Sequence, residues 1–338
     1  MTFDDKYLSA SRKAASKVCV GLDPDLARLP AGVSRDAAGI ATFLTNIIDA
    51  THDLACAYKP NFAFFGALGA DGFSVLRDVI THVPDSVPVI LDFKAGDIGN
   101  TAAKYAEMAY DVLRADAVTV NPYMGEDAVE PFLRGQDKCV FLLCLTSNPG
   151  SADFQRRETE KGPVFELVAR TAADWSDRGS IGLVVGATHP EYLPSVRQVA
   201  PTLPFLIPGV GSQGGDASEI VDQAATADGL GVLINASRSI LYASDGSDYA
   251  GSARQATEEL RATIEGRITE DLRRGSNSVT HPAEVRLQRH RVPTAVHCDI
   301  HRSRQGYPGR SRSVGAFSFD IDRHGHRRVP DSLGLRVV

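Results

Sequence analysis

Short apolar runs alternate along the chain with longer segments in which apolar residues recur three and four positions apart. Consecutive apolar residues rich in Val, Ile, Leu and Phe are typical of parallel strands that are buried on both faces. Eight such runs occur, at Val18–Leu22, Ala57–Phe62, Val87–Phe93, Ala117–Asn121, Cys139–Leu145, Ile181–Gly186, Pro204–Ile207 and Gly231–Asn235. Amphipathic helices are predicted between them, for example at Ala38–Ala55, Thr101–Leu113, Pro163–Arg178 and Gln255–Ile268.

Eight alternations of strand and helix predict an α/β fold of the closed (β/α)8 type, a TIM barrel, which uses about 250 residues. The competing fold is an open doubly wound sheet, but its usual GxGxxG phosphate signal is absent after the first run, which ends in Val20-Gly21-Leu22-Asp23-Pro24. Polar residues favour the barrel, because they fall where its strands end and converge on one mouth. They are Asp23, Lys59, Asp92, Lys94, Asn121, Ser147, Pro208 and Arg238.

The periodic pattern stops after about Arg274, so we divide the chain into a barrel domain, 1–272, and a tail, 273–338. The tail has thirteen Arg, no Lys and five acidic residues, and it holds six of the nine His residues. We predict that it is disordered and assign it no function. A nucleic-acid-binding arm and a His-based metal tract are the alternatives, but scattered Arg and His make a poor ligand set.

Charge and cysteine usage exclude several classes of function. The tail carries a net charge of +8, and because the whole chain carries −6, residues 1–272 carry −14. An acidic body argues against nucleic acid as a partner. The five cysteines form no CxxC pair, and four of them lie in apolar runs, which indicates neither disulfides nor zinc. No apolar stretch reaches the roughly 18 residues that span a bilayer, so we expect a cytoplasmic protein without a membrane partner.

The densest cluster of charge lies in the segment from Val89 to Thr101, which reads VILDFKAGDIGNT. Residues two apart on a strand share a face, so Asp92 and Lys94 are predicted to point into the barrel mouth, with Asp97 on the following loop. An alternating set of acid, base and acid satisfies its own charges, and a structural salt-bridge network is the alternative to a catalytic site. Lys59, at the end of the second run, adds a cation at the same rim.

Two features late in the chain predict a phosphate site. The glycine-rich stretch from Ile207 to Asp216 offers backbone N–H groups that suit an anion, although such a loop is weak evidence alone. Arg238 follows the eighth run, and its guanidinium suits a phosphate. Barrels often bind phosphate with the loops after their seventh and eighth strands, so these positions favour a phosphorylated ligand.

From about Lys17 to Arg261 the chain resembles the orotidine 5'-phosphate decarboxylases, and it is most similar to the longer branch of that family found in actinobacteria. The resemblance rests on motifs in the right order at five strand ends. These are Gly21-Leu22-Asp23-Pro24-Asp25, Tyr58-Lys59-Pro60-Asn61, Asp-x-Lys-x-x-Asp-Ile at Asp92–Ile98 followed by Gly-Asn-Thr, the segment from Pro208 to Gly215, and Asn235-Ala236-Ser237-Arg238. Ala95 stands where the family commonly has a larger residue, outside the tetrad named below.

The resemblance implies a cofactor-free, metal-free decarboxylase that forms uridine 5'-monophosphate in pyrimidine biosynthesis. It implies a catalytic tetrad of Lys59, Asp92, Lys94 and Asp97. In this family Lys94 would protonate C6 of the pyrimidine, and Asp92 would lie beside the departing carboxylate. Asp97 and Thr101 would reach the ligand of a neighbouring subunit, so a homodimer with shared active sites is expected.

The resemblance also implies the contacts to the rest of orotidine 5'-monophosphate. Asp23 and Lys59 would bind the ribose hydroxyls, and Ser147 would contact the pyrimidine. Pro208 is included among the substrate contacts. Gln213 and Arg238 would hold the phosphate.

Two rival functions remain open at this point. Sugar-phosphate lyases and epimerases of the same superfamily share the Asp-x-Lys-x-x-Asp pattern, but they need Mg²⁺ and an acid placed to bind it, and the residues here indicate no dedicated cage. The second rival is a catalytically silent barrel that binds nucleoside monophosphates.

Overall fold

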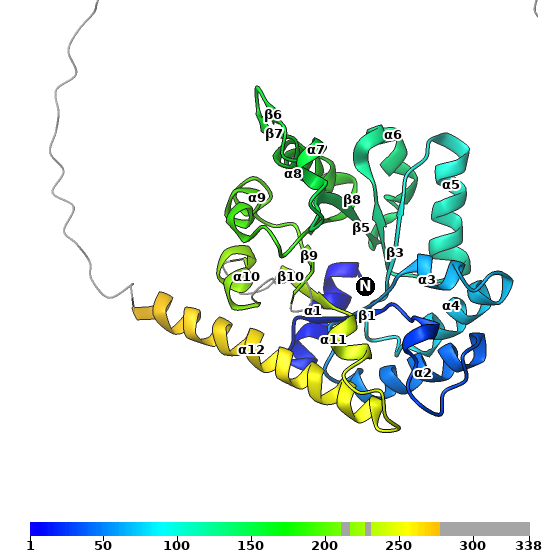
Figure 1. The fold of residues 1–338 in the computed structure, drawn as a ribbon. Coiled ribbons are helices and arrows are strands. Elements are labelled where there is room, and N and C mark those ends of the chain that lie inside the picture. The colour runs from blue at the N-terminus through cyan, green and yellow to red at the C-terminus, as the bar shows by residue number, and fades with distance from the viewer. Residues whose placement is uncertain (211–216, 227–230, 278–338) are drawn as a thin grey trace, which may run out of the picture. The chain divides into compact units, whose positions relative to one another are not determined.

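Eight parallel strands form a barrel in the computed structural model, which describes residues 1–210, 217–226 and 231–277 (Figure 1). Neighbouring strands pair in the order β2-β1-β10-β9-β8-β5-β4-β3. Two parallel bridges, Tyr58 with Val89 and Asn61 with Asp92, then join β2 to β3. The barrel strands are β1 (Val18–Leu22), β2 (Ala57–Pro60), β3 (Ile90–Ala95), β4 (Ala117–Val120), β5 (Gly135–Leu145), β8 (Gly179–Val185), β9 (Phe205–Pro208) and β10 (Val232–Ala236). The predicted (β/α)8 fold is confirmed.

All eight predicted runs are strands, and the differences lie at their ends. β1 has the predicted bounds, whereas β5 begins four residues earlier than its run at Cys139. β3 begins three residues later than its run and continues to Ala95, so Lys94 belongs to the strand. A separate antiparallel hairpin consists of β6 (Glu158–Thr159) and β7 (Gly162–Pro163).

Helices connect the strands and surround the barrel (Figure 1). The α-helices are α1 (Phe3–Ala14), α2 (Ala37–Thr51), α3 (Phe62–Gly66), α4 (Ala70–His82), α5 (Gly99–Glu107), α6 (Glu126–Val129), α7 (Ser151–Phe154), α8 (Val164–Trp175), α9 (Leu193–Val199), α10 (Ala217–Ala224), α11 (Arg238–Leu241) and α12 (Tyr249–Asn277). The 3₁₀ turns are η1 (Leu26–Arg28), η3 (Pro122–Met124), η4 (Glu130–Phe132), η5 (Ser176–Arg178) and η6 (Pro190–Tyr192), and a π-helical turn, η2 (Met108–Val112), continues α5.

The last helix extends beyond its predicted end. α12 continues to Asn277, nine residues past Ile268. The predicted disordered tail lies, apart from the first few residues, outside the described part of the chain. No helix in the described residues has the length and apolar character needed to cross a membrane.

Alternating side chains of the strands build two apolar layers. Val18, Val20 and Leu22 of β1 belong to the layer between the strands and the helices, and Cys19 faces the barrel interior. Cys56 and Cys139 also lie in the interior cluster, and both are buried free thiols, as their apolar surroundings in the sequence indicated. Gly21 lets β1 approach Ser237, the residue after β10, closely, since a Cβ at this position would lie 1.9 Å from Ser237 Oγ.

The amino-terminal helix, α1, closes the N-terminal end of the barrel, and the apolar pattern did not predict it. Thr2 caps α1 by accepting a hydrogen bond from the backbone of Asp5. Phe3 is 1% exposed and its ring meets that of Phe141 edge to face at 5.9 Å. The hydroxyl of Tyr7 donates to the carbonyl of Val232 at 2.8 Å. The apolar pattern is too weak to predict this helix, because few of its residues are large and apolar.

We predict that Phe3→Ala lowers the free energy of unfolding by about 3–5 kcal/mol, because it removes a ring that fills the base of the barrel. Phe154→Ala is the matched control: the same truncation at a side chain that is 69% exposed should change it by no more than about 0.5 kcal/mol. Urea unfolding followed by circular dichroism measures both. Equal losses in the two variants would show that α1 does not support the barrel.

Candidate active site

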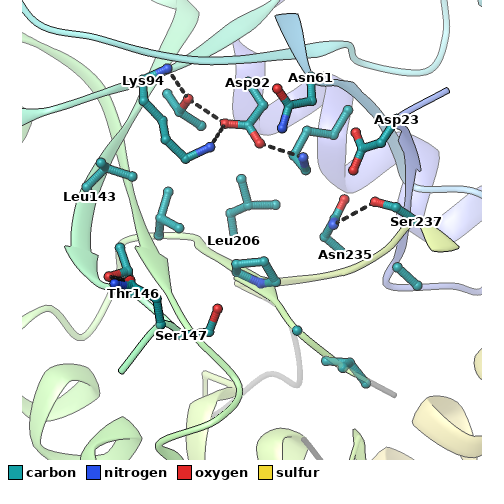
Figure 2. Close-up of a pocket in the computed structure, with 18 of the residues that line it drawn as sticks. Asp23, Asn61, Asp92, Lys94, Leu143, Thr146, Ser147, Leu206, Asn235 and Ser237 are labelled. Atoms are coloured by element: carbon teal, nitrogen blue, oxygen red, sulfur yellow. Dashed lines mark hydrogen bonds and ion pairs between the residues drawn. The ribbon is translucent and has the colours of Figure 1, made fainter. Parts of the chain in front are cut away.

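A cavity of about 390 Å³ opens at the C-terminal ends of the strands. Figure 2 shows Lys94, Asp92 and Asp23 along one side of this cavity, with Leu143 and Leu206 lining the space below them. The predicted site residues that line it are Asp23, Lys59, Asp92, Lys94, Ser147, Pro208 and Arg238. The barrel thus brings together residues that are more than 200 positions apart in the sequence.

Asp92 is the centre of the charged side (Figure 2). Its Oδ2 accepts a hydrogen bond from Lys59 Nζ at 2.7 Å, and its Oδ1 accepts one from Lys94 Nζ at 2.6 Å. The side chains of Lys59 and Asp92 are 5% and 9% exposed, whereas that of Lys94 is 47% exposed. One carboxylate therefore holds two ammonium groups, of which only Lys94 extends into the open cavity.

Electrostatics keeps the buried pair of Lys59 and Asp92 charged. Burial acts to raise the pKa of Asp92, but Lys59 and Lys94 outweigh it and hold that pKa well below its usual range. Burial likewise acts to lower the pKa of Lys59, but Asp92 and then Asp23 outweigh it and raise the pKa. Both groups are therefore ionised throughout the physiological pH range.

The two pKa shifts make the stability of the fold depend on pH in opposite directions. The lowered pKa of Asp92 stabilises the fold above its unfolded value of about 3.9, and this contribution is lost as the pH falls through the folded pKa. The raised pKa of Lys59 stabilises the fold below about pH 10.4, and this contribution is lost as the pH rises through the folded pKa.

Asp97 and Thr101 do not line the cavity of their own chain. Asp97 lies in the loop after β3, where its Oδ1 accepts a hydrogen bond from the backbone N–H of Ile98 at 2.8 Å. Thr101 is exposed in the first turn of α5. That these two side chains reach the ligand of a neighbouring subunit stays a prediction.

Other polar groups complete the lining of the cavity. Among the described residues, Asp23 Oδ1 and Asn235 Oδ1 are buried acceptors without a hydrogen-bond partner. Ser147 fits against Gly186, where a Cβ would lie 2.7 Å from the Ser147 backbone nitrogen. Arg238 is the first residue of α11, whereas Gln213 lies outside the described residues.

Sequence reasoning missed several residues of the cavity, notably Asn61, Thr119, Thr146 and Asn235. Thr119 donates a hydrogen bond to Asp92 Oδ1 at 2.9 Å and is 1% exposed. The signal that would have found it is one polar residue inside the apolar run Ala117–Val120, on the face that alternation assigns to the barrel interior.

Within the described ranges, no three side chains of His, Cys, Asp or Glu gather closely enough to hold an ion. Both oxygens of Asp92 already accept hydrogen bonds from lysine. That the reaction needs neither a metal nor a cofactor stays a prediction.

Comparisons with known proteins agree on one family. The profile of the orotidine 5'-phosphate decarboxylase / HUMPS family matches residues 16–252. An orotidine 5'-phosphate decarboxylase of Herpetosiphon aurantiacus is 49% identical over 258 residues, which cover 76% of this chain and 95% of that protein.

Two solved structures from Leishmania donovani are similar in fold and in sequence. The OMP decarboxylase has a TM-score of 0.69 and 42% identity, over 78% of this chain and 99% of that one. The UMP synthase has a TM-score of 0.70 and 43% identity over 78% of this chain, and the matched region spans 57% of that longer protein.

We predict that Asp92→Asn lowers the pKa of Lys59, because Lys59 stays buried while its nearest anion is lost. Titration of the lysine side-chain resonances by NMR measures this shift. Asp111→Asn, which removes an exposed partner of Arg134, is the matched control and should leave Lys59 unchanged. An unaltered Lys59 titration in Asp92→Asn would show that Asp92 does not keep Lys59 charged.

Proposed function

The chain belongs to the orotidine 5'-phosphate decarboxylase / HUMPS family, and from this premise we propose how its site acts. The activity is that of the relatives, the conversion of orotidine 5'-monophosphate to uridine 5'-monophosphate and carbon dioxide. The observation that carries the assignment of roles is the Lys59–Asp92–Lys94 array at the cavity. It places a partly exposed ammonium beside a carboxylate that stays ionised.

Lys94 is the proton donor in this mechanism. When the bond between C6 and the carboxyl carbon breaks, its electron pair stays on C6 and carbon dioxide leaves. A proton from Lys94 Nζ then forms the C6–H bond of the product. With no cofactor to delocalise the carbanion, a preorganised ammonium at C6 provides the stabilising charge.

Asp92 and Lys59 hold that ammonium in place. Lys59 neutralises one oxygen of Asp92, and the other oxygen binds Lys94. The carboxylate of Asp92 would lie beside the departing carboxylate of the substrate. Repulsion between the two carboxylates raises the energy of the bound substrate, and the ammonium of Lys94 stabilises the carbanion that forms at C6. Both effects favour decarboxylation.

The remaining contacts bind parts of the substrate that do not react. Asp23 and Lys59 bind the ribose hydroxyls, in keeping with the buried acceptor Asp23 Oδ1. Ser147 contacts the pyrimidine. Arg238 and Gln213 bind the phosphate, and this remote binding energy is used in the transition state. Pro208, which lines the cavity, is a further substrate contact.

We propose a homodimer in which each subunit completes the other's site. Asp97 and Thr101 reach the ribose bound in the neighbouring subunit. Large apolar side chains are exposed around this region, namely Ile98, Tyr105, Tyr123 and Met124, at 54%, 39%, 84% and 44%. Met124 lies beside Gly96, where a Cβ would be 3.4 Å from Met124 Cε. Exposed apolar surface of this kind marks an interface.

Because charged nucleotides do not cross bilayers unaided, we propose that the enzyme is cytoplasmic.

We predict that Lys94→Ala lowers turnover of orotidine 5'-monophosphate by about 10⁴-fold or more, because the proton donor and its charge are both lost. The variant should stay folded, since the side chain is 47% exposed. Pyrimidine absorbance measures turnover, and Lys104→Ala, an exposed lysine on α5, is the matched control.

The same assay with a chelator separates the two enzyme classes. Turnover by the wild-type protein should be unchanged when divalent metal is removed. Near-wild-type turnover by Lys94→Ala would overturn the role of Lys94, and loss of turnover in chelator would favour the Mg²⁺-dependent rival.

A mixture of two inactive variants tests the shared site. We predict that Lys94→Ala and Asp97→Ala are each inactive, and that equal amounts reassembled together recover about one quarter of the wild-type activity, because half of the dimers then contain one intact site. Wild-type subunits carried through the same reassembly are the control. A mixture as inactive as its components would show that Asp97 serves its own subunit.

A further inference from the structure

Thr119 occupies an unusual position for a hydroxyl group. It lies on β4 between Val118 and Val120, which pack into the layer outside the barrel, while Ala117 and Thr119 face inward. Its side chain is buried, and its residue is 1% exposed. A buried hydroxyl destabilises a fold unless it is hydrogen-bonded, so its partners explain its presence.

The hydroxyl of Thr119 joins two parts of the catalytic array. It donates to Asp92 Oδ1 at 2.9 Å and accepts from the backbone N–H of Lys94 at 3.0 Å. The directions are fixed, because an ionised carboxylate only accepts and a backbone N–H only donates. Asp92 Oδ1 is also the oxygen that binds Lys94 Nζ at 2.6 Å. Thr119 therefore connects the carboxylate of Asp92 to the backbone of the residue whose ammonium that carboxylate holds.

The backbone at Lys94 needs such a support. Lys94 has a φ of +48°, in the left-handed region that costs a non-glycine residue about 1–2 kcal/mol. The pairing of β3 with β4 shifts between Leu91 and Ala95, so the N–H of Lys94 falls in a break of the ladder. Thr119 supplies the acceptor that a regular strand neighbour would have provided.

We infer that Thr119 is a positioning residue for decarboxylation, which fixes Lys94 and Asp92 relative to each other through its hydroxyl. Thr119 lies at the wall of the cavity, but its hydroxyl is engaged by Asp92 and by the backbone of Lys94, so it acts by keeping the ammonium of Lys94 where C6 is bound. The inference rests on the proposed function for its kinetic consequence, whereas the hydrogen bond itself is open to test without substrate.

Thr119→Val keeps the size and shape of the side chain and removes both hydrogen bonds. A displacement of about 1 Å at a reacting group costs about 10²-fold in rate, so we expect kcat to fall by about 10- to 100-fold. KM should change by less than about 3-fold, because the substrate contacts are intact. Thr119→Ser retains the hydroxyl and should restore kcat to within about 3-fold of wild type.

Thr257→Val is the matched control. Thr257 is fully buried, and its hydroxyl donates to the carbonyl of Ala253 within α12, away from the cavity. This variant loses a buried hydroxyl as Thr119→Val does, and should keep the wild-type kcat. A fall in kcat equal to that of Thr119→Val, or failure of Thr119→Ser to restore it, would show a merely structural role and overturn the inference.

Amide hydrogen exchange gives a readout that does not depend on turnover. In Thr119→Val the N–H of Lys94 loses its acceptor, so its exchange measured by NMR should accelerate at least about 10-fold, while that of Leu91 stays unchanged. Unaltered exchange at Lys94 would overturn the inference even if kcat fell. If exchange accelerates in Thr119→Val but the wild-type protein does not decarboxylate orotidine 5'-monophosphate, the hydrogen bond between Thr119 and Lys94 is supported and the proposed function is rejected.

Discussion

The carboxylate of Asp92, held between Lys59 and Lys94, is the interaction on which the rest of the site depends. A buried carboxylate destabilises a protein unless cations and hydrogen bonds compensate it, and Asp92 has two ammonium groups and a hydroxyl within 2.9 Å. These partners come from three neighbouring strands, so barrel closure and charge compensation require each other. The interior of the barrel is accordingly divided, with apolar side chains at its base and charged side chains at its mouth.

The same arrangement separates the two lysines by exposure. Lys59 is buried at the wall of the cavity and has its charge fixed by Asp92 and Asp23, which suits a cation that stays protonated. Lys94 is half-exposed on the side of the cavity, which suits the role of proton donor that we propose for it. Two residues of one type thus differ in role because their depth differs, and not because of their intrinsic chemistry.

Much of the fold and part of the site could be predicted from the sequence, for reasons that individual residues make clear. Buried parallel strands leave unbroken apolar runs, so all eight were found, and polar residues such as Asp23 and Arg238 stand out at their ends. Alternation placed Asp92 and Lys94 on one face. It could not predict the left-handed backbone of Lys94 or the hydroxyl of Thr119 that supports it, because both depend on how β3 departs from the register of β4. Helix α1 was not predicted because the strands against which it packs lie far away in the sequence.

The docking site of α1 at the base of the barrel is formed by residues that are far apart in the sequence. Tyr7 bonds to Val232, 225 residues further along the chain. Helix α1 also packs against β5, where the ring of Phe3 meets that of Phe141. Docking of α1 therefore joins strands from the middle and the end of the chain across the base of the barrel. Contacts between residues so far apart in the sequence raise the contact order and slow folding, so the base of the barrel is complete only when distant strands have come together.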